Sequence, residues 1–160
     1  MAQLDEFDLK ILTALQENAR MTTQELAERV GLSATPCARR IKRMEDEGLI
    51  ERYVTLLNPE RLGVGLTVFV NVRLNTQSAK TFEAFEAAIR KLPQVVGCYL
   101  LAGNYDYLVQ VRVADVEAFR SFIRDRLVTI DGIGATQSNI VSRGNEVDDG
   151  PAAELVTQNV

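Results

Sequence analysis

The sequence contains no histidine and no tryptophan, and it has only two cysteines among its 160 residues. Histidine is the most frequent general base and a frequent zinc ligand, so its absence argues against hydrolytic and zinc-dependent enzymes. Cys37 and Cys98 lie far apart and are too few for a disulfide framework, which favours buried free thiols. A glycine-rich phosphate loop and a cysteine cluster are missing as well. We therefore predict a protein that is not an enzyme and that holds no metal and no cofactor.

Long apolar runs and a strong charge imbalance between the two halves are also missing. No stretch of about 18 apolar residues occurs, and the N-terminal residues MAQLDEFDLK lack the order of a signal peptide. These absences predict a cytoplasmic protein without a membrane partner. Residues 1–63 and 64–160 each carry half of the 18 basic and half of the 22 acidic residues. A nucleic-acid surface on this chain, whose net charge is −4, must therefore be a local basic cluster.

The first fifty residues predict three short amphipathic helices. Asp5 is placed to cap the first helix, in which apolar residues return at helical spacing up to residue 18. Thr22 precedes an acid by three residues, which is the spacing of a capping box, and Gly31 suits the left-handed position at the end of the second helix. Ser33 can cap a third helix after a turn of a few residues. Two short helices joined by a tight turn are typical of a helix-turn-helix.

The third helix carries the basic cluster, within the segment SATPCARRIKRMEDEG. At 100° per residue its apolar positions share one face, and most of its cations lie opposite. A solvated helix surface is the alternative interpretation, but the second helix of a helix-turn-helix enters the major groove of DNA. Arg40 lies at the boundary of the two faces, where it can brace the domain or reach a flanking phosphate. The predicted contacts to double-stranded DNA are Ser33, Thr35, Arg39, Arg40, Lys42 and Arg43.

Beyond Gly48 the pattern changes to short β-prone segments. Residues 50–56 predict a brief strand, the wing or hinge that follows a helix-turn-helix. Residues 66–75 alternate strictly, and a helix from Ser78 to Pro93, a hairpin around the turn GNYD, a helix capped by Asp115 and a final strand follow. This order is that of the ferredoxin-like βαββαβ fold, with both helices on one face of the sheet. The opposite face should then carry Phe69, Leu100 and Leu108, which predicts a second copy of the chain as its partner.

These elements predict an α+β protein with an N-terminal winged helix-turn-helix and a C-terminal ferredoxin-like domain. The expected division is residues 1–50 for DNA binding, 51–65 for a strand and hinge linker, 66–143 for sensing and oligomerisation, and 144–160 for a flexible acidic tail.

Four segments carry a resemblance to a known family. They are LDEFDLKILTALQENAR, ELAERVGLSATPCARRIKRMEDEGLI, YVTLLNPERLG and YLLAGNYDYLVQVRV. In this order they resemble the Lrp/AsnC (feast/famine) family of transcription regulators, and especially its leucine-responsive branch, over residues 4 to about 143. At Arg39 relatives often carry an acid or a neutral residue, so the resemblance leaves the operator preference open.

The resemblance implies a RAM/ACT-like sensing domain that forms dimers and commonly a tetramer of dimers, a homo-octamer. It also implies a free amino acid as effector, bound between the sensing domains of neighbouring dimers. In such a site Asp106 can supply the anion for the ammonium group, and the backbone of the turn can bind the carboxylate. The implied effector-binding residues are Gly103, Asn104, Tyr105, Asp106, Thr136 and Ser138.

The leading prediction is a sequence-specific DNA-binding regulator whose DNA binding or assembly responds to an amino acid. Its dimers would present paired recognition helices to half-sites about one helical turn apart. Three alternatives stay open. One is an architectural protein that wraps DNA with little sequence preference, and another is a relative that has lost its effector. The third is an enzyme on the ferredoxin-like domain, for which the sequence offers no catalytic group.

Overall fold

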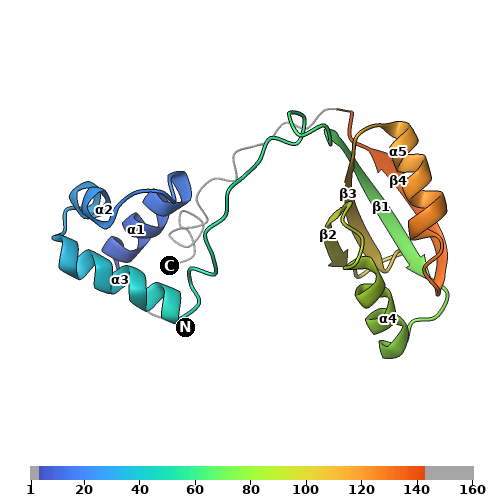
Figure 1. Cartoon of the computed structure of the whole chain (residues 1–160). Helices are drawn as coiled ribbons and strands as arrows, with labels where there is room; N and C mark the ends of the chain where they lie inside the picture. Colours follow the sequence, from blue (N-terminus) through green and yellow to red (C-terminus); the bar gives the residue numbers. More distant parts are fainter. Residues whose placement is uncertain (1–3, 143–160) are drawn as a thin grey trace. The chain divides into compact units, whose positions relative to one another are not determined.

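The computed structural model describes residues 4–142, which form two compact units divided between Leu56 and Leu57 (Figure 1). The acidic tail expected at residues 144–160 lies outside the described residues. Within the described part of the chain, no helix has the length and apolar character needed to cross a lipid bilayer.

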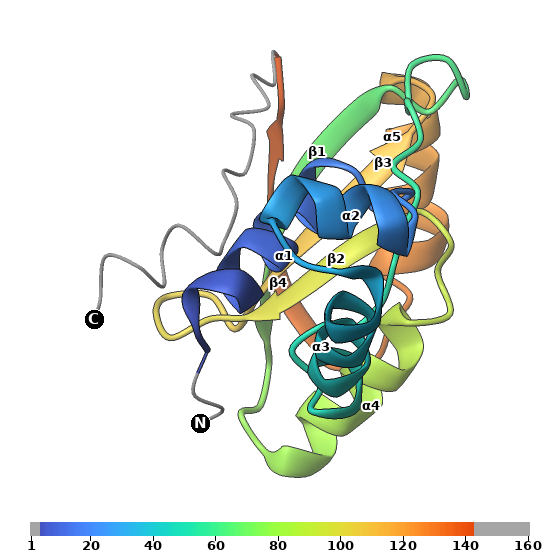
Figure 2. The ribbon, with the colours of Figure 1, turned by 90° about the vertical axis from the view of Figure 1, so that its left-hand side faces the viewer.

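The first unit consists of three helices, α1 (Glu6–Glu17), α2 (Thr23–Val30) and α3 (Ala34–Asp46) (Figure 2). Both predicted caps are confirmed. Asp5 and Thr22 each accept the backbone N–H three residues ahead, and the acid at that position accepts the N–H of the cap in return. Gly31 ends α2 with φ of 77°, the left-handed conformation that glycine adopts without a steric penalty. The helix-turn-helix is therefore formed as Asp5, Thr22 and Gly31 predict.

Apolar side chains from all three helices form the core of the first unit. The apolar face predicted for α3 is confirmed, since Cys37 and Met44 are fully buried and Ile41 packs against them. The buried cluster is Ile11, Ala14, Leu26, Ala27, Val30, Cys37 and Met44.

Ser33 precedes α3 as predicted, but its hydroxyl makes no capping hydrogen bond. The physical reason is the third residue of the helix. In α1 and α2 the cap accepts from that residue's N–H, whereas in α3 the position is Pro36, which has no N–H to donate.

This difference between caps predicts a difference in stability. Thr22→Ala is expected to lower the free energy of unfolding by about 1 kcal/mol, because the Glu25 N–H in the first turn of α2 loses its acceptor. Ser33→Ala is the matched control and is expected to change it by no more than a few tenths of a kcal/mol, since no capping bond is lost. Urea denaturation followed by circular dichroism measures both, and an equal loss in the two variants would contradict the assignment.

The brief strand expected at residues 50–56 is not formed, and residues 51–58 have no regular secondary structure. A strand needs a neighbouring strand for its backbone hydrogen bonds, and no segment within residues 4–142 pairs with this one. Its apolar side chains remain exposed, Leu56 to 92%. With α1 the segment encloses an apolar groove of about 490 Å³, lined by Leu9, Leu12, Leu15, Leu49, Tyr53 and Val54 among others.

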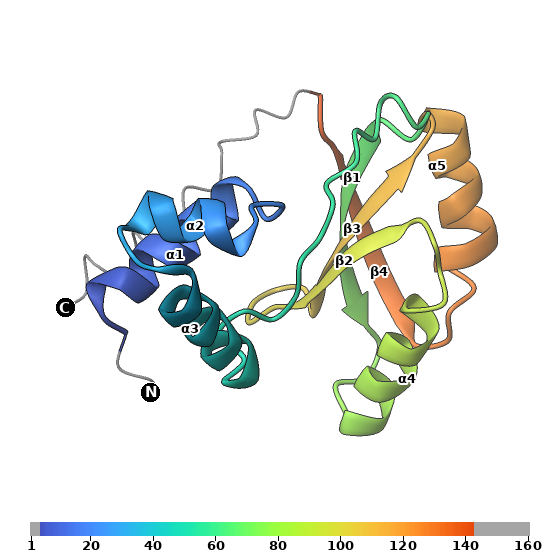
Figure 3. The same cartoon turned by 60° about the vertical axis from the view of Figure 1, so that its left-hand side comes forward.

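The second unit is a four-stranded antiparallel sheet covered on one face by two helices (Figure 3). The spatial order of the strands is β2-β3-β1-β4, the ferredoxin-like order that the sequence predicts. α5 continues as a short π-helix, Ile123–Leu127. The elements are β1 (Leu66–Leu74), α4 (Ala79–Ile89), β2 (Val95–Leu100), β3 (Tyr107–Val113), α5 (Val116–Phe122) and β4 (Ile133–Ile140).

The core of the second unit lies between the sheet and its helices. Strict alternation places β1 positions 68, 70, 72 and 74 inward, as predicted, and positions 68, 70 and 72 lie opposite Val111, Val109 and Tyr107 of β3. Helix residues close this layer. The main helical contributors are Phe85, Ile89, Phe119 and Phe122.

The other face of the sheet has no helix over it, and we call it the helix-free face, defined by Phe69, Tyr99, Leu108 and Gln110. The prediction was right for Phe69 and Leu108 but wrong for Leu100, which pairs with Tyr107 and so shares the parity of the core. The cause is a bulge near the start of β2, which shifts the register and reverses the faces beyond it.

Candidate functional site

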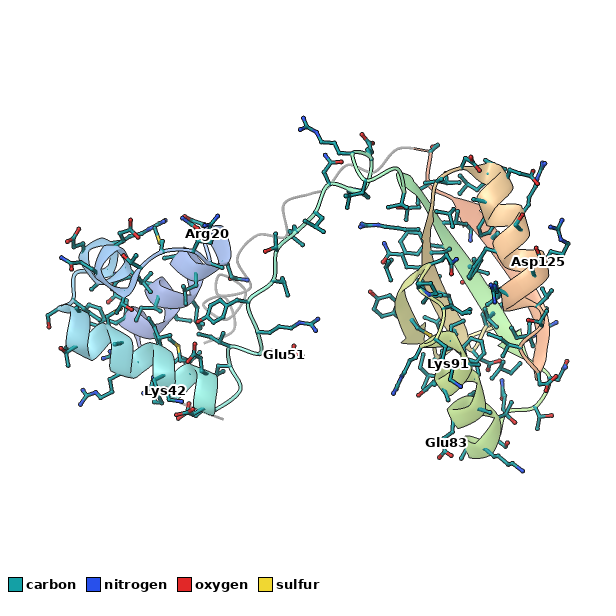
Figure 4. The ribbon with its side chains drawn as sticks, viewed as in Figure 1. Arg20, Lys42, Glu51, Glu83, Lys91 and Asp125 are labelled. Atoms are coloured by element: carbon teal, nitrogen blue, oxygen red, sulfur yellow. The ribbon has the colours of Figure 1, made fainter. Side chains whose placement is uncertain are left out.

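The basic face of α3 is the first candidate site. Arg39 is exposed, and no ion pair involves it within the described part of the chain. Lys42 is 69% exposed and lies on the outward side of α3 (Figure 4), where its Nζ is 2.5 Å from Oδ1 of Asp46. Ser33 and Thr35 are exposed at the beginning of the helix. These four predicted residues thus share an accessible surface that offers cationic and hydroxyl groups.

The remaining two predicted cations, Arg40 and Arg43, are held by acids of α1. Arg40 Nη1 lies 2.7 Å from Oδ2 of Asp5 and 2.8 Å from Oδ1 of Asp8. Arg43 Nη2 lies 2.6 Å from Oδ2 of Asp8. The hydrogen bonds that Arg40 donates to the carboxylates of Asp8 and Asp5 raise the pKa of its guanidinium group, so the group stays charged.

Arg43 is exposed, as its predicted place on the basic face requires, but the sequence did not predict its ion pair with Asp8. A helical projection reports the direction of Cα–Cβ but not the reach of a long side chain toward a neighbouring helix. Arg40 joins α3 to α1, which agrees with the bracing role among its two predicted roles, and its contact with DNA stays a prediction.

Asp8 is the residue that the sequence did not single out. Its side chain is only 1% exposed, yet it is charged and meets two guanidinium groups. The available signal was its place three residues after Asp5, which indicates a capping box and nothing more. The partners on α3 lie more than thirty residues away in the sequence, so no local pattern predicts this pairing.

The loop between β2 and β3 is the second candidate site. Gly103 and Asn104 are exposed at its tip. The hydroxyl of Tyr105 donates a 2.9 Å hydrogen bond to Oε1 of Gln137 on β4. The predicted turn GNYD therefore connects the two strands, with its first two residues exposed.

Asp106 faces inward and anchors this loop. The carboxylate is 6% exposed and accepts hydrogen bonds from the Leu74 backbone N–H at 2.7 Å and from Nε2 of Gln77 at 2.8 Å. Its own N–H donates to the Val72 carbonyl at 2.9 Å. Within one chain Asp106 thus joins the loop to the end of β1.

Thr136 and Ser138 lie on β4 opposite Val72 and Val70, on the parity of the core. Gln137, the partner of Tyr105, has the opposite parity. A single chain therefore does not bring all six predicted effector residues to one side of the sheet.

Two family descriptions match the chain. Residues 4–51 match a winged helix-turn-helix DNA-binding domain, and residues 67–148 match the Lrp/AsnC ligand binding domain. The matches account for both units of the structure.

Curated relatives agree with these descriptions. The leucine-responsive regulatory protein of Salmonella typhimurium is 41% identical over 138 residues, which are 86% of this chain and 84% of that protein. The proline dehydrogenase transcriptional activator of Rhizobium radiobacter is also 41% identical, over 86% of this chain and 88% of that protein.

Solved structures show the same architecture. A transcriptional regulator from Neisseria meningitidis, determined as a complex with L-Met, has a TM-score of 0.85 and 41% identity over 92% of this chain and 94% of its own. An AsnC family regulator from Agrobacterium tumefaciens has a TM-score of 0.85 and 36% identity over 89% and 93%. The chain is therefore a member of the Lrp/AsnC family of DNA-binding transcriptional regulators, which carry a ligand-binding domain and are not enzymes.

Proposed function

We propose that the protein regulates transcription by inserting α3 into the major groove of DNA, and that a free amino acid bound to the second unit modulates this binding. The observation that carries the DNA contact is the accessible row on α3. Arg39 and Lys42 can neutralise phosphates or reach guanine edges, and the hydroxyls of Ser33 and Thr35 can bind phosphate at the start of the helix. In this proposal Arg40 holds α3 against α1 through its ion pairs with Asp5 and Asp8.

The effector proposal rests on the ligand-binding family and on the L-Met complex of a similar regulator. The β2–β3 loop offers the backbone of Gly103 and Asn104 for a carboxylate, and Asp106 offers the negative charge that an ammonium group requires. Because Thr136 and Ser138 lie on another side of the sheet, we propose that the complete pocket forms between sensing units of neighbouring copies.

Self-association is proposed on the helix-free face. Phe69 and Leu108 are half-buried there and Tyr99 is exposed, although no helix covers them. A second copy that meets this face across a two-fold axis would form the dimer, and four dimers would form the octamer. The proposed division at residues 1–50, 51–65, 66–143 and 144–160, the cytoplasmic location and the independence from cofactors complete the assignment.

The decisive experiment is DNA binding in a salt series, with promoter fragments from the protein's own genome and random duplexes. Arg39→Gln and Lys42→Gln are each expected to weaken binding and to reduce the slope of log K against log salt by about 1, because one phosphate contact is lost. Added amino acids are screened in the same titration, and the effector should change the affinity about 5- to 150-fold.

Arg20→Gln is the matched control, since Arg20 lies on the opposite side of the first unit from Lys42 (Figure 4). Wild-type affinity in both α3 variants would refute the interface. Equal affinity for promoter and random DNA would instead favour the architectural alternative, in which phosphate contacts and DNA bending supply the binding energy.

A further inference from the structure

In the ion cluster between α1 and α3, two arginines of α3 are bound to different extents. Both guanidinium groups bind the carboxylate of Asp8, Arg40 at Oδ1 and Arg43 at Oδ2. Arg40 has a second carboxylate, Asp5, lies over the ring of Phe7 at 5.6 Å and is 24% exposed. Arg43 has Asp8 as its acidic partner and is 42% exposed. Arg40 is therefore built into the unit, whereas Arg43 is held by one ion pair at the surface.

Release of Arg43 would leave no uncompensated buried charge. A buried carboxylate that loses its only cation is strongly destabilised, but Asp8 would keep Arg40 at 2.8 Å and the backbone N–H of Asp5 at 3.1 Å. A DNA phosphate is an equivalent partner for a guanidinium group, since both anions accept charge-assisted hydrogen bonds in the same geometry. Exchange of the Asp8 carboxylate for a phosphate is thus balanced in charge.

We propose that Asp8 is a positioning residue that holds Arg43 in the free protein and gives it up to a DNA phosphate in the complex. This proposal rests on the proposed α3 interface. In the free protein two of the four cations of α3 are neutralised by α1, so the field that attracts any duplex is weakened. Arg43 contributes only where the fit of α3 brings a phosphate close enough to displace Asp8. The internal ion pair therefore disfavours loose, non-specific binding.

The test is a double-mutant cycle of Asp8→Asn, Arg43→Gln and the combined variant, measured in a salt series against random duplex DNA and against promoter fragments. On random DNA, Asp8→Asn is expected to raise the affinity about 3- to 10-fold and to steepen the salt slope by about 1, because Arg43 becomes available. Arg43→Gln is expected to make the slope shallower by about 1 on promoter fragments and to leave it unchanged on random DNA, where Asp8 already holds Arg43. The gain from Asp8→Asn must disappear when Arg43 is also replaced.

Glu17→Gln is the matched control. It removes one negative charge from α1 and releases Arg29 of α2 rather than a cation of α3, so it reports the effect of net charge alone. The proposal is overturned if folded Asp8→Asn binds like Glu17→Gln, or if its gain persists in the combined variant. If Asp8→Asn does not fold, Arg43→Gln decides, since it keeps the Arg40 bridges, and a wild-type salt slope of that variant on promoter fragments also overturns the proposal.

The two proposals fail in different ways. Wild-type binding by Arg39→Gln and Lys42→Gln would refute the α3 interface itself. If those variants lose binding but the double-mutant cycle gives no coupling energy between Asp8 and Arg43, only the exchange of Arg43 is refuted.

Discussion

Asp106→Ala is expected to lower the free energy of unfolding of the second unit by about 2–4 kcal/mol, because the buried N–H of Leu74 loses its acceptor and Gln77 loses a charge-assisted hydrogen bond. The β2–β3 loop would then be tied to β1 mainly by the backbone bond from Asp106 to Val72. The expected loss is large because these bonds lie inside the unit, where water cannot replace them readily.

Asp106→Asn separates the structural role from the charge. The amide oxygen can still accept from Leu74, so the variant should lose only about 1 kcal/mol. A thermal-shift screen of the common amino acids is then run on wild type and on this variant. An effector at 100 times its Kd should stabilise wild type by about 2.7 kcal/mol, and Asp106→Asn should need at least about tenfold more of it if the carboxylate binds the ammonium group.

Asn104→Ala is the control for loop stability, because Asn104 is exposed at the tip and should change the free energy of unfolding by less than about 0.5 kcal/mol. If Asp106→Asn responds to the effector like wild type, the predicted ammonium site is wrong and Asp106 acts only as an anchor. If Asp106→Ala is as stable as wild type, the anchoring role is wrong.

Leu26→Ala is expected to lower the free energy of unfolding of the first unit by about 2–5 kcal/mol and to abolish DNA binding at 37 °C. Leu26 is fully buried in a cluster supplied by three short helices. A core this small provides only a few kcal/mol of net stability, so the cavity left by alanine removes most of it. The second unit has a separate core and should stay folded.

Two matched variants make this expectation specific. Leu56→Ala removes the same atoms from a side chain that is 92% exposed, and it should change stability by less than about 0.5 kcal/mol. Phe85→Ala deletes a buried ring of the second unit and should cost about 3–5 kcal/mol there. Circular dichroism melts, DNA titration and the amino-acid thermal shift together assign each loss to a unit. Loss of the effector response in Leu26→Ala would contradict the separation of the two cores.

For the basic cluster of α3, a helical projection of the sequence predicts burial but not ion pairing. It places Cys37, Ile41 and Met44 correctly inside, because burial follows the helical period of 3.6 residues. It does not show that Arg40 and Arg43 reach the acids of α1. Four clustered cations in the sequence thus become two accessible ones and two that are paired across the unit.

The second unit shows the same limit in its sheet. The alternation in β1 and β3 is predictable because one face of each strand must be buried. The bulge in β2 is set by its pairing with β3, so the inward parity of Leu100 could not be read from β2 alone. Register likewise decides that Thr136 and Gln137, adjacent in sequence, face opposite sides of the sheet.

Apart from the strand expected at residues 50–56 and the cap expected at Ser33, the sequence by itself determined the elements, their order and the caps at Asp5 and Thr22, because each depends on residues a few positions apart. Only the tertiary structure decided which charges are available and which polar groups serve as anchors. Asp8 and Asp106 are buried carboxylates whose partners lie some thirty residues away, and such contacts form only when the helices pack and the strands pair. Local patterns are governed by backbone geometry, whereas long-range polar contacts are governed by which surfaces the fold brings together.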